Sequence, residues 1–122
     1  DTDMPTLFGE VARNQYRLGD HDDGGALLDI GGHIGATALL HAIVHSAARV
    51  YTFEPAPLNF FYFAWNLIAN NVSSRRVVMR NAALSSNGSN ITMRFSPQGS
   101  MRSAANSLGY YNTSRQVRVA AV

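Results

Sequence analysis

Three glycines and an acid stand close together in the stretch LLDIGGHIGATALL, which covers residues 27–40. Asp29 closes an apolar run, Gly31, Gly32 and Gly35 follow it, and a second apolar run begins directly afterwards. Glycines at such a place let the backbone adopt positive φ and let a ligand approach with no Cβ in its way. The pattern therefore predicts a small-molecule site at a turn between a strand and a helix.

The glycine spacing discriminates between ligand classes. A dinucleotide fingerprint needs G-x-G-x-x-G, and a phosphate loop needs G-x-x-x-x-G-K-[ST]. The chain has neither of them here, and it contains no lysine. What remains is acid-x-Gly-x-x-x-Gly beginning at Asp29, a glycine turn without phosphate-binding chemistry.

A second acid, Glu54, lies 19 residues after Gly35 and directly before Pro55. That interval is close to the ~20 residues at which an acid meets the ribose in nucleotide-binding βαβ units. Two carboxylate oxygens suit the two adjacent hydroxyls of an adenosine ribose. With the glycine turn, Glu54 predicts an adenosine ligand that has no phosphate, a description that S-adenosylmethionine meets. The alternative is that Glu54 only caps the helix that follows.

Alternating strands and helices would position these residues. We expect strand Ala26–Ile30, helix Ala36–Ala48, strand Arg49–Phe53, helix Pro57–Asn70 and strand Arg76–Arg80. This order predicts right-handed crossovers and a parallel sheet, whose ligands bind at the carboxyl ends of the strands. Asn90–Phe95 and Gln116–Val122 are predicted to form an antiparallel pair, and residues 4–13 a short helix before a polar linker over 14–25.

Composition limits the class of protein. The chain has 122 residues, of which 46% are hydrophobic and 15% charged, a composition that predicts one globular domain with a hydrophobic core. A net charge of +2, with the arginines scattered, argues against a nucleic-acid surface. The absence of cysteine excludes disulfides and thiolate catalysis. We expect no membrane-spanning segment and, by default, a cytoplasmic location.

Two further clusters invite a chemical interpretation. His41 and His45 are four residues apart on a predicted helix, but no third ligand accompanies them, so we predict no metal site. The aromatic residues Phe60, Phe61, Tyr62, Phe63 and Trp65 lie in one predicted helix. They could stack on single-stranded nucleic acid. Because a helix directs them all around its axis, core or interface packing is the favoured interpretation.

The chain closely resembles the FkbM-type S-adenosylmethionine-dependent methyltransferases from about Leu27 to Val122. The glycine turn, VYTFEPAPLNFFYFAWNLIANN and VVMRNAALSSNGSNITMRF carry the resemblance. Its most specific part is Phe53-Glu54-Pro55-x-Pro57-x-Asn59-Phe60, continuing to Asn66 and Asn70. The family usually has Ala-Asn where this chain has Gly32-His33. The resemblance implies a Rossmann-like, class I methyltransferase fold, an α/β three-layer sandwich.

The resemblance also implies the cofactor, S-adenosyl-L-methionine, and the residues around it. The first motif falls on Asp29 to Gly35, the ribose acid on Glu54, and the segment lining the adenine pocket on Asn81-Ala82-Ala83-Leu84. We expect cofactor-binding residues Asp29, Gly31, Gly32, His33, Ile34, Gly35, Thr37, Glu54, Pro55, Asn81 and Ala82, and we assign no catalytic residue. The implied reaction is methyl transfer to a hydroxyl of a small molecule or sugar.

Two other hypotheses stay open. The chain could be a non-catalytic S-adenosylmethionine-binding module, or a nicotinamide-dependent oxidoreductase, which the missing G-x-G-x-x-G disfavours. We divide the chain into residues 1–25, an N-terminal helix and linker, and 26–122, the cofactor-binding part of a methyltransferase domain. Because the family's next segment, resembling Asp-x-Glu-Gly, has no counterpart, we expect a C-terminally truncated domain with an incomplete sheet. Such a fragment would be marginally stable and inactive alone. We also expect a side chain at Gly31 to intrude on the turn.

Overall fold

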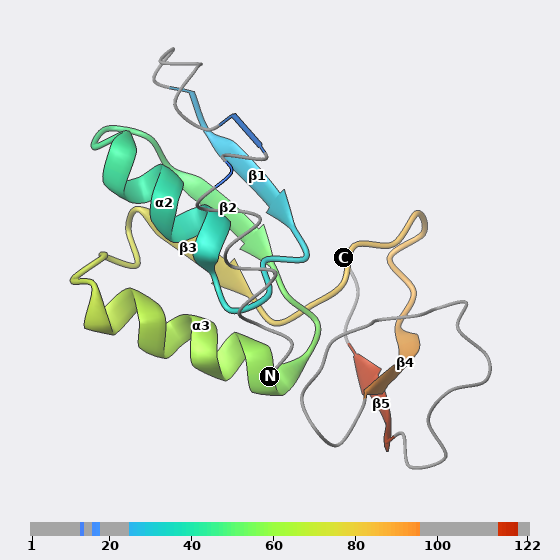
Figure 1. Cartoon of the computed structure of the whole chain (residues 1–122). Helices are drawn as coiled ribbons and strands as arrows, with labels where there is room; N and C mark the ends of the chain where they lie inside the picture. The colour runs from blue at the N-terminus through green and yellow to red at the C-terminus, as the bar shows by residue number, and fades with distance from the viewer. Residues whose placement is uncertain (1–12, 14–15, 18–24, 96–114, 120–122) are drawn as a thin grey trace.

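Three short parallel strands form the sheet that positions the candidate site. The computed structural model describes residues 13, 16–17, 25–95 and 115–119. Strands β1 (Leu27–Ile30), β2 (Val50–Phe53) and β3 (Val77–Arg80) lie in the order β1-β2-β3 (Figure 1). Ile30 pairs with Phe53, and Phe53 pairs with Arg80, so the three strands end level with one another. The predicted parallel α/β sheet is confirmed.

Two helices connect the strands. Helix α2 (Ala36–Val44) joins β1 to β2, and α3 (Pro57–Ala69) joins β2 to β3. Pro57 opens α3, a position where its missing N–H costs nothing and its fixed φ suits the helix. In the described residues, neither helix has the length and apolarity to cross a membrane.

Helix α2 ends four residues before its predicted end, Ala48. The guanidinium of Arg76, the residue before β3, donates to the carbonyl oxygens of Ala42 and His45, the latter at 2.7 Å. The last carbonyls of a helix have no partner within it, and a cation is favoured beside them. Arg76, more than 30 residues away in sequence, therefore helps to end α2.

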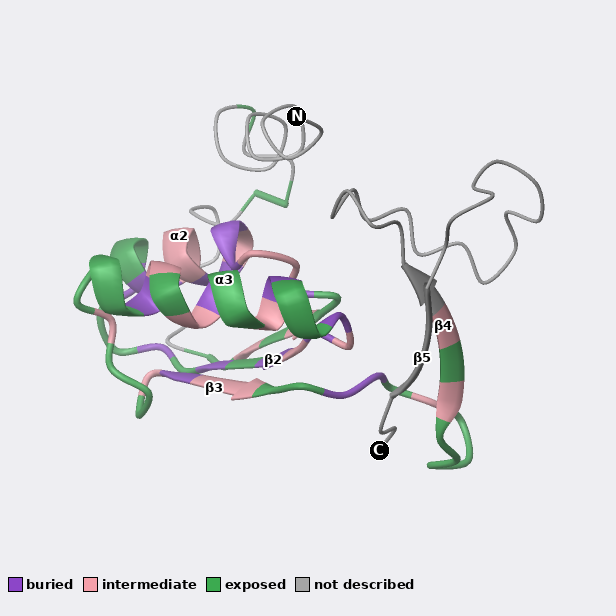
Figure 2. Ribbon diagram, turned by 90° about the horizontal axis from the view of Figure 1, so that it is seen from below, coloured by how far each residue is buried: buried purple, intermediate pink, exposed green. Residues whose placement is uncertain are grey.

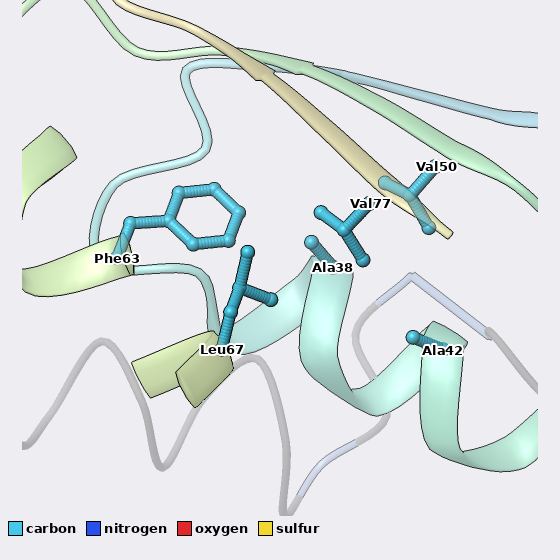
Figure 3. Packing of buried hydrophobic residues seen from close by; sticks show 6 residues of the cluster. All are labelled: Ala38, Ala42, Val50, Phe63, Leu67 and Val77. Carbon is cyan, nitrogen blue, oxygen red and sulfur yellow. The ribbon is translucent and has the colours of Figure 1, made fainter. Parts of the chain in front are cut away.

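The hydrophobic core lies between the sheet and the two helices. Val50, Thr52 and Val77 are buried on one face of the sheet. Alanines on α2 allow a close approach, and Phe63 with Leu67 fill the remaining space beside them (Figure 3). The core cluster comprises Ala38, Ala42, Val50, Phe63, Leu67 and Val77.

Among the described elements, both helices lie on the same face of the sheet (Figure 2). The opposite face presents exposed apolar side chains, among them Leu28 at 58% and Ile30 at 62% of their full exposure. The described part of the fold therefore has two layers, and β1 has β2 as its one neighbour there. A helix on the other face, as a three-layer sandwich requires, does not occur in the described ranges.

An antiparallel pair follows the parallel strands, as predicted. Strand β4 (Ile91–Phe95) pairs with β5 (Arg115–Val119), with Ile91 opposite Val119. The last predicted residues of this pair, 120–122, lie outside the described residues. The predicted helix over 4–13, apart from residue 13, and most of the predicted linker lie outside them as well.

Candidate functional site

Two loops meet at the carboxyl edge of the parallel sheet. The first, residues 31–35, leaves β1, and the second, residues 54–56, leaves β2. The backbone N–H groups of Gly31 and Gly32 both donate to the Phe53 carbonyl oxygen, at 2.8 and 3.1 Å. The glycine turn is thereby fixed against the end of β2, at the edge where ligands of open parallel sheets bind.

The three positions of the turn require glycine for different structural reasons. Gly35 has φ +91°, and a Cβ there would lie 2.2 Å from the Phe63 ring. At Gly32 a Cβ would lie 2.2 Å from the Thr52 hydroxyl oxygen. At Gly31, where φ is +88°, a Cβ would meet nothing within 4 Å. The expectation that a Gly31 side chain would collide with the turn is wrong, because the constraint there is φ alone. A Cβ at Gly31 would lie in open space.

Glu54 joins the two loops. Its Oε2 accepts a hydrogen bond of 2.8 Å from the His33 N–H in the first loop. Its Oε1 accepts two hydrogen bonds, one of 2.7 Å from the Ala56 N–H and one of 3.4 Å from the Asn59 amide nitrogen. The residue is 4% exposed. A carboxylate has about four lone-pair positions, so these three donors use three of them and one remains, on Oε2.

The environment of Glu54 disfavours its charge. Burial raises the pKa of this carboxyl above its ordinary value of 4.5, and the nearby Asp29 carboxylate raises it further. The hydrogen bonds from the Ala56 and His33 N–H groups act in the opposite direction, but burial outweighs them. Raised pKa values at a carboxyl in a loop region are typical of functional sites, although structural networks produce them too.

This pKa shift predicts how folding stability depends on pH. A carboxyl whose pKa is higher in the folded state binds protons more tightly there, so folding is favoured as the pH falls from that pKa toward 4.5. Urea unfolding across this range should show the free energy of unfolding of the wild type rising relative to Glu54→Gln. Parallel pH profiles for the two proteins would show that Glu54 does not titrate there.

Asparagine side chains support both loops from neighbouring elements. Asn66 of α3 donates its amide N–H to the Ile34 carbonyl oxygen at 2.8 Å, holding the glycine turn. Asn81, just after β3, donates to the Glu54 carbonyl oxygen at 2.8 Å. From the resemblance, Asn81 is expected to line the adenine pocket, whereas Asn66 is only one residue of the family signature. The spacing of Asn59 and Asn66, seven residues apart on one helix face, was the available signal.

Asn66→Ala should loosen the glycine turn. Losing one partly buried hydrogen bond costs ~1 kcal/mol of the free energy of unfolding. Asn70→Ala is the matched control, because Asn70 donates its amide to the Asn66 carbonyl on the exposed surface and should cost ~0.5 kcal/mol or less. Denaturation in urea measures both. Equal losses would mean that the Asn66 contact does not stabilise the turn.

The remaining predicted site residues lie around the same edge. Asp29 is half-buried on β1, with a carboxylate oxygen 3.4 Å from the Thr52 hydroxyl. Thr37, in the first turn of α2, and Pro55, in the second loop, are half-buried, and Ala82 is buried after β3. The structure thus places the predicted residues in the loops and first turns beside one sheet edge. Their contact with a cofactor stays a prediction.

His41 of α2 and His45, the residue after its end, pack against each other. The ring centroids of His41 and His45 are 4.6 Å apart, and His45 is 8% exposed. In the described part of the chain, no group of three His, Cys, Asp or Glu side chains is arranged to hold a metal ion.

Comparison with known proteins supports the fold. No family model matches the chain, and no curated protein matches it in sequence. A solved structure of coclaurine N-methyltransferase, bound to N-methylheliamine and SAH, is similar, with a TM-score of 0.52 and 24% identity over 60% of this chain. The match spans 22% of that chain. The chain therefore has a Rossmann-like α/β fold, similar to that of the matched part of this methyltransferase. The resemblance to the FkbM type stays a prediction.

Proposed function

We propose that the chain binds S-adenosylmethionine at the carboxyl edge of its parallel sheet, as the cofactor-binding part of a methyltransferase. The observation that carries this proposal is the Glu54 carboxylate, which links the glycine turn to the loop after β2. The fold similarity adds support, because the similar coclaurine N-methyltransferase was solved with SAH, the demethylated form of this cofactor.

The residues at this edge fit an adenosine that has no phosphate. Glu54 keeps one acceptor position on Oε2, which suits one ribose hydroxyl rather than both. The open space in front of Gly31 lets the ligand approach the backbone of the turn. Leu84, 40% exposed beyond β3, offers an apolar surface where the resemblance places the adenine.

When bound, S-adenosylmethionine supplies a methyl group on a positively charged sulfur. The protein's contribution is to hold donor and acceptor in line and to exclude water. From the resemblance, we propose that the acceptor is a hydroxyl oxygen of a small molecule or sugar. A hydroxyl must lose its proton during transfer, which requires a base. We assign that role to no described residue.

A second candidate is a binding module without turnover. The match spans 22% of the similar methyltransferase, so that protein's activity is not carried over to this chain. The two candidates share the cofactor site and differ only in catalysis.

Two measurements separate these functions. Calorimetric titration should show binding of S-adenosylmethionine and SAH, but not of NAD; binding of NAD alone would favour an oxidoreductase and overturn the proposal. Transfer of a radiolabelled methyl group to sugar or small-molecule hydroxyls would establish the enzyme. Cofactor binding without transfer to any acceptor would favour the module.

A further inference from the structure

The outer side of helix α3 presents an exposed apolar surface. Its residues, which we call the α3 apolar face, are Leu58, Phe61, Tyr62, Trp65 and Ile68, exposed by 49, 53, 51, 56 and 68%. They recur at helical spacing and lie opposite Asn59, Phe63 and Leu67, which are buried beneath the helix. Figure 2 shows the exposed stretches along α3. Neither the core nor the candidate cofactor site uses this face.

The aromatic rings of this face are already arranged against one another. Phe61 lies edge-on to Tyr62, with ring centroids 5.6 Å apart and an interplanar angle of 71°. Its ring centroid is 6.3 Å from that of Trp65, at 66°. Three of the five side chains therefore form one connected aromatic group. Contiguous apolar patches of this kind on a soluble protein mark interaction sites.

The face bears no charge. Helix α3, over Pro57–Ala69, contains no Asp, Glu, Lys, Arg or His. In an interface with two-fold symmetry a surface meets its own copy, so any net charge on it would be repelled by the same charge. An uncharged aromatic and aliphatic face is free of that penalty. Membrane-surface helices, in contrast, combine an apolar face with Lys or Arg, and nucleic-acid stacking platforms lie in basic grooves.

The size of the face suits a small dimer interface. Three half-exposed aromatic side chains and two half-exposed aliphatic ones would bury on the order of 500 Å² per copy. Two copies together would then bury about 1,000 Å², the lower bound for a specific protein interface. Aromatic residues, Trp and Tyr in particular, are also those that contribute most to binding energy in such interfaces.

We propose that the α3 apolar face is a self-association surface, on which a second copy of this chain packs its own α3 around a two-fold axis. This inference is independent of the proposed cofactor. Trp65 is the one tryptophan of the chain, so its fluorescence reports directly on this face.

Sedimentation equilibrium and Trp65 quenching by acrylamide, measured over a range of concentrations, test the proposal. We expect the mass to double by about 100 µM and the quenching of Trp65 to fall as the dimer forms. Phe61→Glu should raise the dissociation constant about 30-fold, the effect of losing one strong interface residue. Ile68→Glu, at the most exposed position of the face, repeats the test should Phe61→Glu fail to fold.

Leu28→Glu is the matched control, because it adds the same charge to an equally exposed apolar residue on the uncovered face of the sheet. It should change the dissociation constant by less than about threefold. A chain that stays monomeric throughout would overturn the proposal. So would a dimer that Leu28→Glu breaks and both α3 variants leave intact. Protection of Trp65 by phosphatidylserine vesicles, with the chain monomeric without them, would overturn it in favour of a membrane surface.

Discussion

Gly35→Ala is expected to lower the free energy of unfolding by ~3 kcal/mol or more, a large fraction of the ~5–15 kcal/mol typical of a folded protein. The new Cβ would lie 2.2 Å from Cδ2 and 2.4 Å from Cε2 of the Phe63 ring. Phe63 is fully buried within the core cluster, so its ring cannot move aside without displacing its neighbours. Overpacking of this kind costs ~1–3 kcal/mol, and the left-handed φ of +91° adds ~1–2 kcal/mol.

Gly31→Ala is the matched control for this prediction. Its φ of +88° is nearly the same, but its Cβ would meet nothing within 4 Å. The left-handed strain alone should therefore cost ~1–2 kcal/mol. Urea denaturation followed by far-ultraviolet circular dichroism compares the two variants. If both lose the same stability, the contact between the glycine turn and Phe63 is not what excludes a side chain at residue 35.

Replacing Glu54 should separate its observed role in linking the two loops from the ribose contact that we propose for it. Glu54→Ala leaves the His33 and Ala56 N–H groups without their acceptor, which costs ~2–4 kcal/mol of the free energy of unfolding. If Glu54 binds the ribose as proposed, the variant also loses a charge-assisted hydrogen bond, and SAH binding should weaken by ~1.5–3 kcal/mol, or roughly 10- to 100-fold. Calorimetric titration at a temperature where the variant stays folded measures the second effect.

Glu54→Gln is the more informative partner variant. It keeps the size of the side chain and removes the buried charge, and the relief of that burial offsets the hydrogen bonds it loses. We expect its stability to stay within ~1 kcal/mol of the wild type while SAH binds about tenfold more weakly. Unchanged affinity in both variants would show that Glu54 organises the loops but does not contact the cofactor.

Much of the fold could be predicted because its signals are local. Pro57 marks the start of a helix, and the glycines after Asp29 mark a turn, whatever the rest of the chain does. The end of α2 could not be predicted in this way. Arg76 reaches it from the turn before β3, more than 30 residues later, and such a contact leaves no trace in the sequence around Val44.

In the candidate site, too, local sequence signals could be predicted and contacts between residues distant in sequence could not. The separation of Gly35 and Glu54 in sequence indicates a shared site, but it does not indicate the direction in which the carboxylate points. Three protein donors occupy three of its lone-pair positions, a feature that the sequence separation does not reveal. The Asn66 side chain donates a hydrogen bond to the carbonyl oxygen of Ile34, which is distant in sequence, so its contact with the glycine turn is seen only in the folded structure.

The most direct test of the proposed site is a titration of the isotope-labelled chain with SAH, followed by amide chemical shifts in nuclear magnetic resonance. The proposal predicts that the largest shifts fall in residues 31–35 and 54–56, the two loops that Glu54 joins. Signals of the α3 apolar face should stay unchanged at a constant protein concentration. Saturating SAH that leaves both loops unshifted, or shifts confined to other parts of the chain, would contradict the central claim.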